Sequence, residues 1–207
     1  MLDKEVILIG YSGHGYVVAE TALENNFTIV GYSEKSEQIN NPFNIRYLGF
    51  EGSEDFLGWS KSDCFILGIG DNSIRQNVAS LIKNKKKTML SLIHSSALIS
   101  KSAKIGQGTF INKNVSVNAC AIIGENSILN TGCIIEHECV LHDAVHVAPG
   151  AVLAGNVQVG ERTFIGANAV VRQGIIIGKD VIIGAGSVVL KDVLDNEIWM
   201  GNPAKKK

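Results

Sequence analysis

The stretch from Ala97 to Asp192 reads ALISKS AKIGQG TFINKN VSVNAC AIIGEN SILNTG CIIEHE CVLHDA VHVAPG AVLAGN VQVGER TFIGAN AVVRQG IIIGKD VIIGAG SVVLKD. The spaces divide it into sixteen hexapeptides, and the third residue of each is Ile, Leu or Val, from Ile99 to Val189. A fixed period that continues over about half of a chain indicates a repeat architecture.

The period of six fits neither an α-helix, whose apolar residues recur every 3.6 residues, nor a two-faced strand, whose period is two. It fits a short strand followed by a corner, repeated so that one aliphatic side chain per side points into a prism. Three hexads make one triangular coil. Sixteen hexads therefore predict a little over five coils, which stack to roughly 25 Å at about 4.8 Å per strand.

The fourth position of the hexad is the expected corner. It holds Gly or Asn in nine of the sixteen hexads, namely Gly106, Asn112, Asn118, Gly124, Asn130, Gly160, Gly166, Gly178 and Gly184. Both residue types tolerate positive φ, so we expect the backbone to turn there in the left-handed region.

Composition and charge exclude several classes of function. The net charge of −1 on 207 residues gives no electrostatic footprint for nucleic acid. The chain has no apolar run long enough to span a membrane, and its start shows no signal segment, so we expect a cytoplasmic protein. The four cysteines have no paired spacing, and we expect reduced thiols that line the core: Cys64, Cys120, Cys133 and Cys139.

The first half of the chain contains no hexad and predicts a separate domain, 1–94, before the repeat domain, 95–207. Alternating strands and helices indicate a small Rossmann-like α/β domain with a parallel sheet. The expected strands are 6–10, 27–32, 64–70 and 88–93. The expected helices are 16–23 and about 73–83, the second with Asp71, Asn72 and Ser73 as candidate N-caps.

The first strand runs into a glycine-rich turn, Gly10-Tyr-Ser-Gly13-His-Gly15. Its spacing differs from the dinucleotide-binding G-x-G-x-x-G, but glycines after a first strand let backbone N–H groups approach a phosphate. A tight turn without a ligand is the alternative. A second turn, Gly68-Ile-Gly70, opens on the same carboxyl edge, where open α/β sheets bind ligands. Because the domain is small for a dinucleotide, we expect a nucleotide diphosphate that bears a sugar.

The repeat departs from its own pattern in four successive hexads, whose fourth positions hold Glu136, His142, Ala148 and Ala154. The same stretch contains Glu136-His137-Glu138, followed by His142 and His146. Failure of a local pattern often marks a functional site. The alternative is that these polar residues decorate an exposed face of the prism.

A histidine flanked by carboxylates suits acyl transfer from a thioester to an amine or a hydroxyl, which needs a base near neutral pH. We expect His137 to be that base, with Glu138 as the first choice for the orienting carboxylate and Glu136 as the second. One coil later, Gly155 should stack on His137 and offer its N–H to the developing oxyanion. The pair His137 and His142 resembles the paired zinc ligands of prism-shaped carbonic anhydrases, whose third ligand lies about two coils upstream. That place holds Lys101 and Gly106 here, so we expect no metal.

Six motifs are spread over nearly the whole chain: GYSGHG at 10–15, GDNSIR at 70–75, LIHSSALIS at 92–100, NTGCIIEHEC at 130–139, AGN at 154–156 and GNPAK at 201–205. Together they resemble hexapeptide-repeat sugar acetyltransferases of the sialic acid O-acetyltransferase-like family. Within it, the chain is most similar to N-acetyltransferases that act on UDP-4-amino-4,6-dideoxy-N-acetylglucosamine in bacillosamine synthesis. GDP-perosamine N-acetyltransferases are close relatives.

The resemblance implies both the fold and the chemistry. It implies that the repeat domain is a left-handed parallel β-helix, a hand opposite to the general preference of parallel crossovers. It also implies acetyl-CoA as donor, a homotrimer with active sites between adjacent prisms, and a nucleotide-linked sugar held by the N-terminal domain.

The resemblance also assigns roles to residues. His137 falls on the catalytic base, Glu138 on its partner, and Asn130 and His146 on positions near the acceptor sugar and the thioester. The implied positions for the nucleotide-sugar are Ser12, Gly13, His14, Ser33, Glu34, Lys35 and Gly70. The implied CoA positions, along successive coils, are His146, Ala154, Gly155, Gly166, Ala167 and Ala185. The tail Lys205–Lys207 either meets the CoA phosphates or forms a solvated terminus.

Three functions are consistent with these residues. The first is an acetyl-CoA-dependent N-acetyltransferase acting on the 4-amino group of a UDP-linked amino-deoxy sugar, with a GDP-linked sugar as a variant. Because the family often has an acidic residue where this chain has Ser33, the nucleotide base stays open. The second is an O-acetyltransferase on a sialic acid or related sugar. The third, a non-catalytic β-helix that binds a nucleotide, is disfavoured by the Glu-His-Glu cluster.

Overall fold

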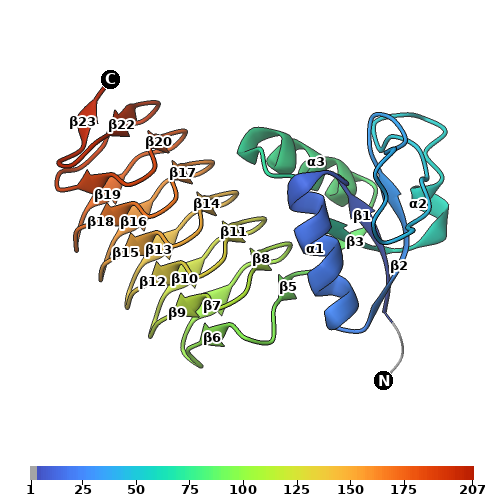
Figure 1. The fold of residues 1–207 in the computed structure, drawn as a ribbon, viewed down its shortest axis with the longest axis horizontal. Coiled ribbons are helices and arrows are strands. Elements are labelled where there is room, and N and C mark those ends of the chain that lie inside the picture. The colour runs from blue at the N-terminus through green and yellow to red at the C-terminus, as the bar shows by residue number, and fades with distance from the viewer. Residues whose placement is uncertain (1–3) are drawn as a thin grey trace. The chain divides into compact units, whose positions relative to one another are not determined.

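The computed structural model describes residues 4–207, so the first three residues, which bear on the expected absence of a signal segment, lie outside the described part. The chain divides into two compact units, Met1–His94 and Ser95–Lys207. Figure 1 shows an α/β unit that is followed along the chain by a coiled stack of short strands.

The first unit has a parallel sheet of four strands in the order β2-β1-β3-β4, as predicted for a Rossmann-like domain. Its elements are β1 (Lys4–Ile9), α1 (Gly13–Glu24), β2 (Phe27–Ser33), α2 (Gly58–Lys61), β3 (Cys64–Leu67), α3 (Asn72–Asn84), β4 (Thr88–Met89) and β5 (Leu92–Ile93). The short helix α2 has no counterpart among the expected elements. The strand expected at 88–93 is two strands, because Leu90 and Ser91 interrupt it.

The strand order creates a switch point between the two central strands of this sheet. Strand β2 lies beside β1 towards one side of the sheet, and β4 lies beside β3 towards the other. The direction of the connections therefore reverses between β1 and β3. At a switch point of this kind, the loops after the two strands diverge and leave a crevice at their carboxyl ends.

The second unit is a left-handed parallel β-helix in which every hexad supplies one two-residue strand, at its second and third positions. The strands are β6 (Leu98–Ile99), β7 (Lys104–Ile105), β8 (Phe110–Ile111), β9 (Ser116–Val117), β10 (Ile122–Ile123), β11 (Ile128–Leu129), β12 (Ile134–Ile135), β13 (Val140–Leu141), β14 (His146–Val147), β15 (Val152–Leu153), β16 (Gln158–Val159), β17 (Phe164–Ile165), β18 (Val170–Val171), β19 (Ile176–Ile177), β20 (Ile182–Ile183) and β21 (Val188–Val189). Strands β22 (Ile198–Met200) and β23 (Lys205–Lys206) follow the last hexad.

The hexad strands stack into three flat faces (Figure 1). The first face contains β6, β9, β12, β15, β18 and β21; the second β7, β10, β13, β16 and β19; the third β8, β11, β14, β17 and β20. Neighbouring strands are offset by eighteen residues, so that Ile122 pairs with both Lys104 and Val140. Each residue therefore lies over the residue one coil earlier, as predicted.

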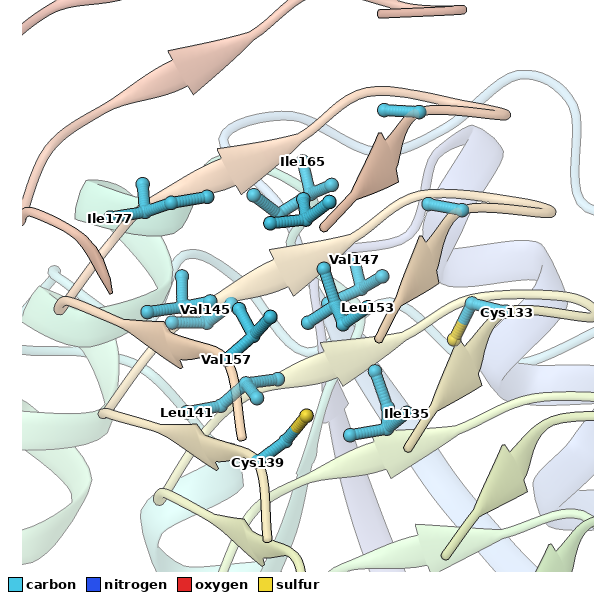
Figure 2. Packing of buried hydrophobic residues seen from close by; sticks show 14 of the residues in the cluster. Cys133, Ile135, Cys139, Leu141, Val145, Val147, Leu153, Val157, Ile165 and Ile177 are labelled. Carbon is cyan, nitrogen blue, oxygen red and sulfur yellow. The ribbon is translucent and has the colours of Figure 1, made fainter. Parts of the chain in front are cut away.

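The third-position side chains fill the prism. In Figure 2, Ile135, Leu141 and Val147 from three successive hexads converge on the interior, and all three are at most 1% exposed. Cys133 and Cys139 are buried beside them, and burial raises the pKa of the Cys133 thiol to about 12. The prediction of core-lining thiols is wrong for the exposed Cys120 and the half-buried Cys64.

The role predicted for the fourth position is wrong. Positive φ occurs at the sixth position, in Gly108, Asn114, Cys120, Asn126, Gly132, Glu138, Ala144, Gly150, Asn156, Arg162, Asn168, Gly174, Asp180 and Gly186. The fourth-position glycines have another cause. A Cβ on Gly106 would lie 2.5 Å from the backbone N of Glu125, and one on Gly166 would lie 2.5 Å from that of Ala185. At these places the next coil approaches too closely for a side chain.

Candidate active site

The histidine predicted as the base lies at the corner that follows β12. Its Nδ1 is 3.1 Å from Oε2 of Glu138, a sixth-position residue with a φ of 61°. Glu136 instead accepts a hydrogen bond from the backbone N–H of His137, at 3.4 Å. Of the two candidate partners, Glu138 is therefore the one that contacts the imidazole.

This pairing determines which ring nitrogen of His137 carries the proton. A carboxylate at Nδ1 holds the proton there and leaves the lone pair of Nε2 to accept a proton from a substrate. The side chains of His137 and Glu138 are 59% and 66% exposed, so their interaction contributes little to the free energy of unfolding. This geometry is the one that the predicted general base and its orienting carboxylate require.

Gly155 lies directly over this histidine, as the eighteen-residue offset predicts. The backbone N–H of Asn156 donates to the carbonyl of His137 at 2.8 Å. A Cβ built on Gly155 would be 2.5 Å from Cε1 and 2.6 Å from Nε2 of the imidazole. The ring is therefore packed against the bare backbone of the next coil.

Gly155 is buried under the imidazole, yet its backbone N–H has no hydrogen-bond partner within residues 4–207, and the residue before it explains why. At other corners a fourth-position side chain caps the fifth-position N–H: Asn112 accepts from Lys113 at 2.7 Å, and Asn130 accepts from Thr131 at 2.8 Å. Ala154 has no side-chain acceptor, and nothing within residues 4–207 accepts a hydrogen bond from the Gly155 N–H. A backbone N–H without a partner beside an imidazole is what the oxyanion of acyl transfer requires.

The other two predicted acceptor-site residues also meet. Nδ2 of Asn130 is 3.4 Å from Nε2 of His146, a buried residue on β14. The ring of Phe164 packs edge-on against the imidazole of His146, with the centroids 5.0 Å apart. Asn130 and His146 thus form one group on the third face and its corner, while His137, Glu138 and Gly155 form another.

The CoA positions implied by the resemblance lie on two corners of the prism. Ala167 and Ala185 are one coil apart at the corner after the third face, where the N–H of Gly186 donates to the carbonyl of Ala167 at 2.8 Å. Gly166 and Asn130 share that corner. Ala154 and Gly155 lie at the corner after the first face. The two corners are the two ends of the first face, and the positions advance along the β-helix from β15 to β20. Their contact with CoA stays a prediction.

In the first unit, the glycine-rich turn links β1 to α1. Gly10 has a φ of 89°, and a Cβ on Gly15 would lie 2.3 Å from the carbonyl oxygen of Gly10. These two glycines are explained by the tight turn itself, the alternative considered from the sequence. Gly13 differs, because a Cβ there meets nothing within 4 Å. Gly13 is thus the glycine of this turn that the protein's own packing does not require.

A cavity of about 520 Å³ lies at the carboxyl edge of the sheet. Its lining includes Gly10, Ser12, Ser33, Glu34, Lys35, Glu51 and Gly70, with an apolar wall of Phe50, Ile69, Ile74, Val78 and Leu81. Five of the predicted nucleotide-sugar residues, Ser12, Ser33, Glu34, Lys35 and Gly70, are therefore brought together. Gly13 and His14 are not part of this lining.

Glu51 is a cavity residue that sequence reasoning missed. It is 8% exposed, and its Oε2 accepts a hydrogen bond from Oγ of Ser33 at 2.5 Å. The Ser33 hydroxyl accepts in turn from the Glu51 N–H at 2.8 Å. Oε1 of Glu51 makes no hydrogen bond within the described chain. A single Glu in a long loop gives no signal in the sequence, but here it supplies a carboxylate at the end of β2.

Arg75 is the second missed residue, although it belongs to the GDNSIR motif. It is 1% exposed, and its guanidinium donates to the carbonyls of Ile69 and Gly70 at 3.2 and 3.1 Å. It thereby fixes the turn after β3, where Asp71 caps α3 by accepting from the Ile74 N–H at 2.8 Å. Burial and then the Arg75 charge lower the pKa of His14 to about 4, so His14 is neutral at pH 7.

The C-terminal tail is folded back rather than free. Strand β23 pairs antiparallel with β22, and Nζ of Lys206 lies 2.7 Å from Oε1 of Glu197. Across residues 4–207, no group of three or more His, Cys, Asp or Glu side chains is arranged to hold a metal ion. Within the same residues, no helix has both the length and the apolar character that a membrane crossing needs.

Comparison with known families identifies both halves of the chain. Residues 5–82 match the PglD N-terminal domain, and residues 138–173 and 156–191 match the bacterial transferase hexapeptide (six repeats). A UDP-N-acetylbacillosamine N-acetyltransferase of Bacillus subtilis (strain 168) is 34% identical over 117 residues. That match spans 51% of this chain and half of the length of the curated relative.

Solved structures match over the full length. A variant of perosamine N-acetyltransferase from Caulobacter crescentus, in complex with CoA and GDP-perosamine, is 33% identical with a TM-score of 0.93, covering 100% of this chain and 98% of that one. The acetyltransferase domain of PglB from Neisseria gonorrhoeae, in complex with acetyl coenzyme A, is 31% identical with a TM-score of 0.91, covering 99% and 100%.

The matched families cover both units, and the full-length relatives bind CoA or acetyl-CoA in the structures named above. The resemblance inferred from six motifs is therefore confirmed. The chain belongs to the hexapeptide-repeat sugar acetyltransferases that carry a PglD-type N-terminal domain.

Proposed function

We propose that this protein transfers the acetyl group of acetyl-CoA to the 4-amino group of a nucleotide-linked amino-deoxy sugar. A UDP-linked sugar is the first candidate, and a GDP-linked 4-amino sugar is the second, because the full-length relative from Caulobacter crescentus binds GDP-perosamine. The observation that carries the proposal is the imidazole of His137, which contacts the Glu138 carboxylate and packs against the backbone of Gly155, whose N–H has no hydrogen-bond partner within residues 4–207.

The residues define a sequence of proton and bond changes. The sugar amine attacks the thioester carbonyl carbon while Nε2 of His137 accepts the amine proton. The carbonyl oxygen becomes an oxyanion that the Gly155 N–H stabilises, and Glu138 stabilises the imidazolium. The tetrahedral intermediate then expels the CoA sulfur, which takes the proton from His137. The products are the acetamido sugar and free CoA thiol.

The cavity of the first unit is the proposed site for the nucleotide. Its glycine turns offer backbone N–H groups to the diphosphate. The same lining holds the Ser33–Glu51 pair, whose second carboxylate oxygen accepts hydrogen bonds from the ribose hydroxyls or the base. This carboxylate occupies the region where the family often has an acidic residue at position 33, so Glu51 compensates for the serine.

The division of the site between two corners supports a homotrimer. His137 and Gly155 lie at one end of the first face, whereas Asn130, His146, Gly166 and Ala167 lie at or beside the other. One flat sheet separates the two groups within a single prism. A second prism packed against the first would bring one group of each together. Light scattering that gives a monomer mass would contradict this assembly.

The test is a turnover assay with purified protein, acetyl-CoA and UDP- or GDP-linked 4-amino sugars, in which released CoA thiol is measured. His137→Ala should lower kcat roughly 10²–10⁴-fold, the usual contribution of a positioned base. His142→Ala, an exposed histidine one hexad later, is the matched control and should keep the wild-type kcat.

The product distinguishes the remaining candidates. An acetamide survives alkaline hydroxylamine, whereas an acetate ester is cleaved, so a labile product would indicate O-acetylation instead. Turnover of neither sugar by the wild-type protein, together with nucleotide binding, would support the non-catalytic β-helix. Normal turnover by His137→Ala would remove His137 from the mechanism.

A further inference from the structure

Asn112 belongs to none of the groups described as contacting substrates, yet it is 2% exposed and fully hydrogen-bonded. It lies at the corner after β8, one coil before Asn130. Its Oδ1 accepts the Lys113 N–H at 2.7 Å. Its Nδ2 donates to Oδ1 of Asn130 at 3.0 Å and to Oγ1 of Thr131 at 2.9 Å.

These bonds determine which way both amides face. The Lys113 N–H is a backbone donor that cannot be reversed, so the oxygen of Asn112 must face it and the NH₂ must face the next coil. Oδ1 of Asn130 then receives two donors, Asn112 Nδ2 and the Thr131 N–H. The NH₂ of Asn130 is consequently turned towards His146, 3.4 Å from its Nε2.

The chain of donors ends on a specific nitrogen of His146. An amide NH₂ can only donate, so Nε2 of His146 must carry a lone pair and the ring proton must be on Nδ1. We propose that Asn112 is a positioning residue that acts through Asn130 to hold His146 as the Nδ1–H tautomer. Its significance for acetyl transfer rests on the proposed function, in which His146 lies near the acceptor and the thioester.

This assignment separates the tasks of the two histidines. His137 is exposed and its Nε2 is free, so it can accept a proton. The Nε2 lone pair of His146 is already used by Asn130, so His146 cannot be the base and presents a fixed ring to the site. Stacked asparagines also stabilise β-structure by themselves, and the experiment must therefore separate positioning from stability.

The first measurement is the ¹⁵N spectrum of histidine-labelled protein, which reports the tautomer of each imidazole. In the wild type, His146 should show a protonated Nδ1 and an unprotonated Nε2. Asn112→Leu should move His146 towards a mixture of tautomers. Asn130→Asp places an acceptor beside Nε2, and its conversion of His146 to the Nε2–H form validates the reporter. A wild-type His146 in the Nε2–H form, or an Asn112→Leu spectrum identical to that of the wild type, would overturn the proposal.

The second measurement is kinetic. Asn112→Leu should lower kcat/KM for the nucleotide-sugar about tenfold, the effect of losing one well-placed hydrogen bond. In an Asn130→Ala background the same substitution should have no further effect, because the two residues act as one unit. An effect that persists in that background contradicts the inference.

Thr109→Val is the matched control for stability. Thr109 is in the same hexad, is 1% exposed, and makes hydrogen bonds to the Gly124 carbonyl at 2.9 Å and from the Ser127 N–H at 3.2 Å. Thr109→Val should lower Tm while leaving kcat/KM unchanged. If Thr109→Val lowered kcat/KM as much as Asn112→Leu does, the role of Asn112 would be structural only. If the wild type shows no acetyl transfer, the proposed function fails, but the tautomer measurement still decides this inference.

Discussion

Replacement of Gly155 by alanine tests the packing of His137, the proposed base, without altering His137 itself. The added Cβ would lie 2.5 Å from Cε1 and 2.6 Å from Nε2 of His137, whereas carbon contacts are normally about 3.5 Å. The imidazole must therefore move by about 1 Å, and its exposed side chain can do so without disturbing the core. A misplacement of about 1 Å typically costs on the order of 10²-fold in rate, so we expect kcat to fall about 10²-fold.

The assay for Gly155→Ala combines kcat, from CoA thiol release, with Tm from calorimetry. Tm should change little, because Gly155 does not have a positive φ that alanine would strain. In a His137→Ala background the methyl group has room, so Gly155→Ala should cost nothing more. A wild-type kcat in the single variant, or a tenfold further loss in the double variant, would refute the argument that Gly155 acts on the imidazole.

Three further outcomes are expected. Gly13→Val should leave Tm and the Kd for acetyl-CoA near wild-type values but raise KM for the nucleotide-sugar roughly tenfold, because its side chain enters the open space where we propose that the diphosphate binds. A loss of acetyl-CoA binding instead would reverse the roles proposed for the two units. Glu51→Gln should raise KM for the nucleotide-sugar about tenfold, because the substrate loses a hydrogen bond to the carboxylate. If that bond is to the ribose, the KM for a 2′-deoxyribose analogue should rise less. An unchanged KM would show that Glu51 does not contact the nucleotide-sugar. Because the pKa of His14 is about 4, below its ordinary value of about 6.5, the native state binds fewer protons than the unfolded state, so the free energy of unfolding should fall as pH drops from about 6.5 to 4. Urea titrations of His14→Asn should show a shallower fall, and an identical pH dependence would contradict this.

The hexad pattern predicts the β-helix almost completely because one physical requirement recurs sixteen times. A β-branched or Leu side chain must point inward at each third position, and the strands from Leu98–Ile99 to Val188–Val189 all end there. The offset of eighteen residues follows, and with it the stacking of Gly155 on His137. The location of the turn does not follow, because glycine is used for two reasons. The fourth position needs it for close approach of the next coil, and the sixth needs it for positive φ.

The lining of the cavity could not be predicted from the pattern of residues in the sequence. Glu51 lies eighteen positions after Ser33, in the loop that follows β2, and no periodicity connects the two. Likewise, the choice between Glu136 and Glu138 depends on which carboxylate returns to the imidazole. Only the positions of the atoms at that corner decide it. The sequence identifies Asn112 as one of nine fourth-position Gly or Asn residues, but it does not predict the hydrogen bonds that Asn112 makes.

The eighteen-residue offset has a consequence for how this chain can change in length. His137 and Gly155 face each other because the chain between them makes one complete circuit. Insertion of a single residue in that circuit would bring Ala154 over the imidazole, and deletion of one would bring Asn156 there. Whole circuits could be added or removed beyond the two corners without altering this meeting. The prism can therefore lengthen or shorten by whole circuits of eighteen residues. The segment from 138 to 154 must keep its length, because otherwise His137 and Gly155 would not face each other.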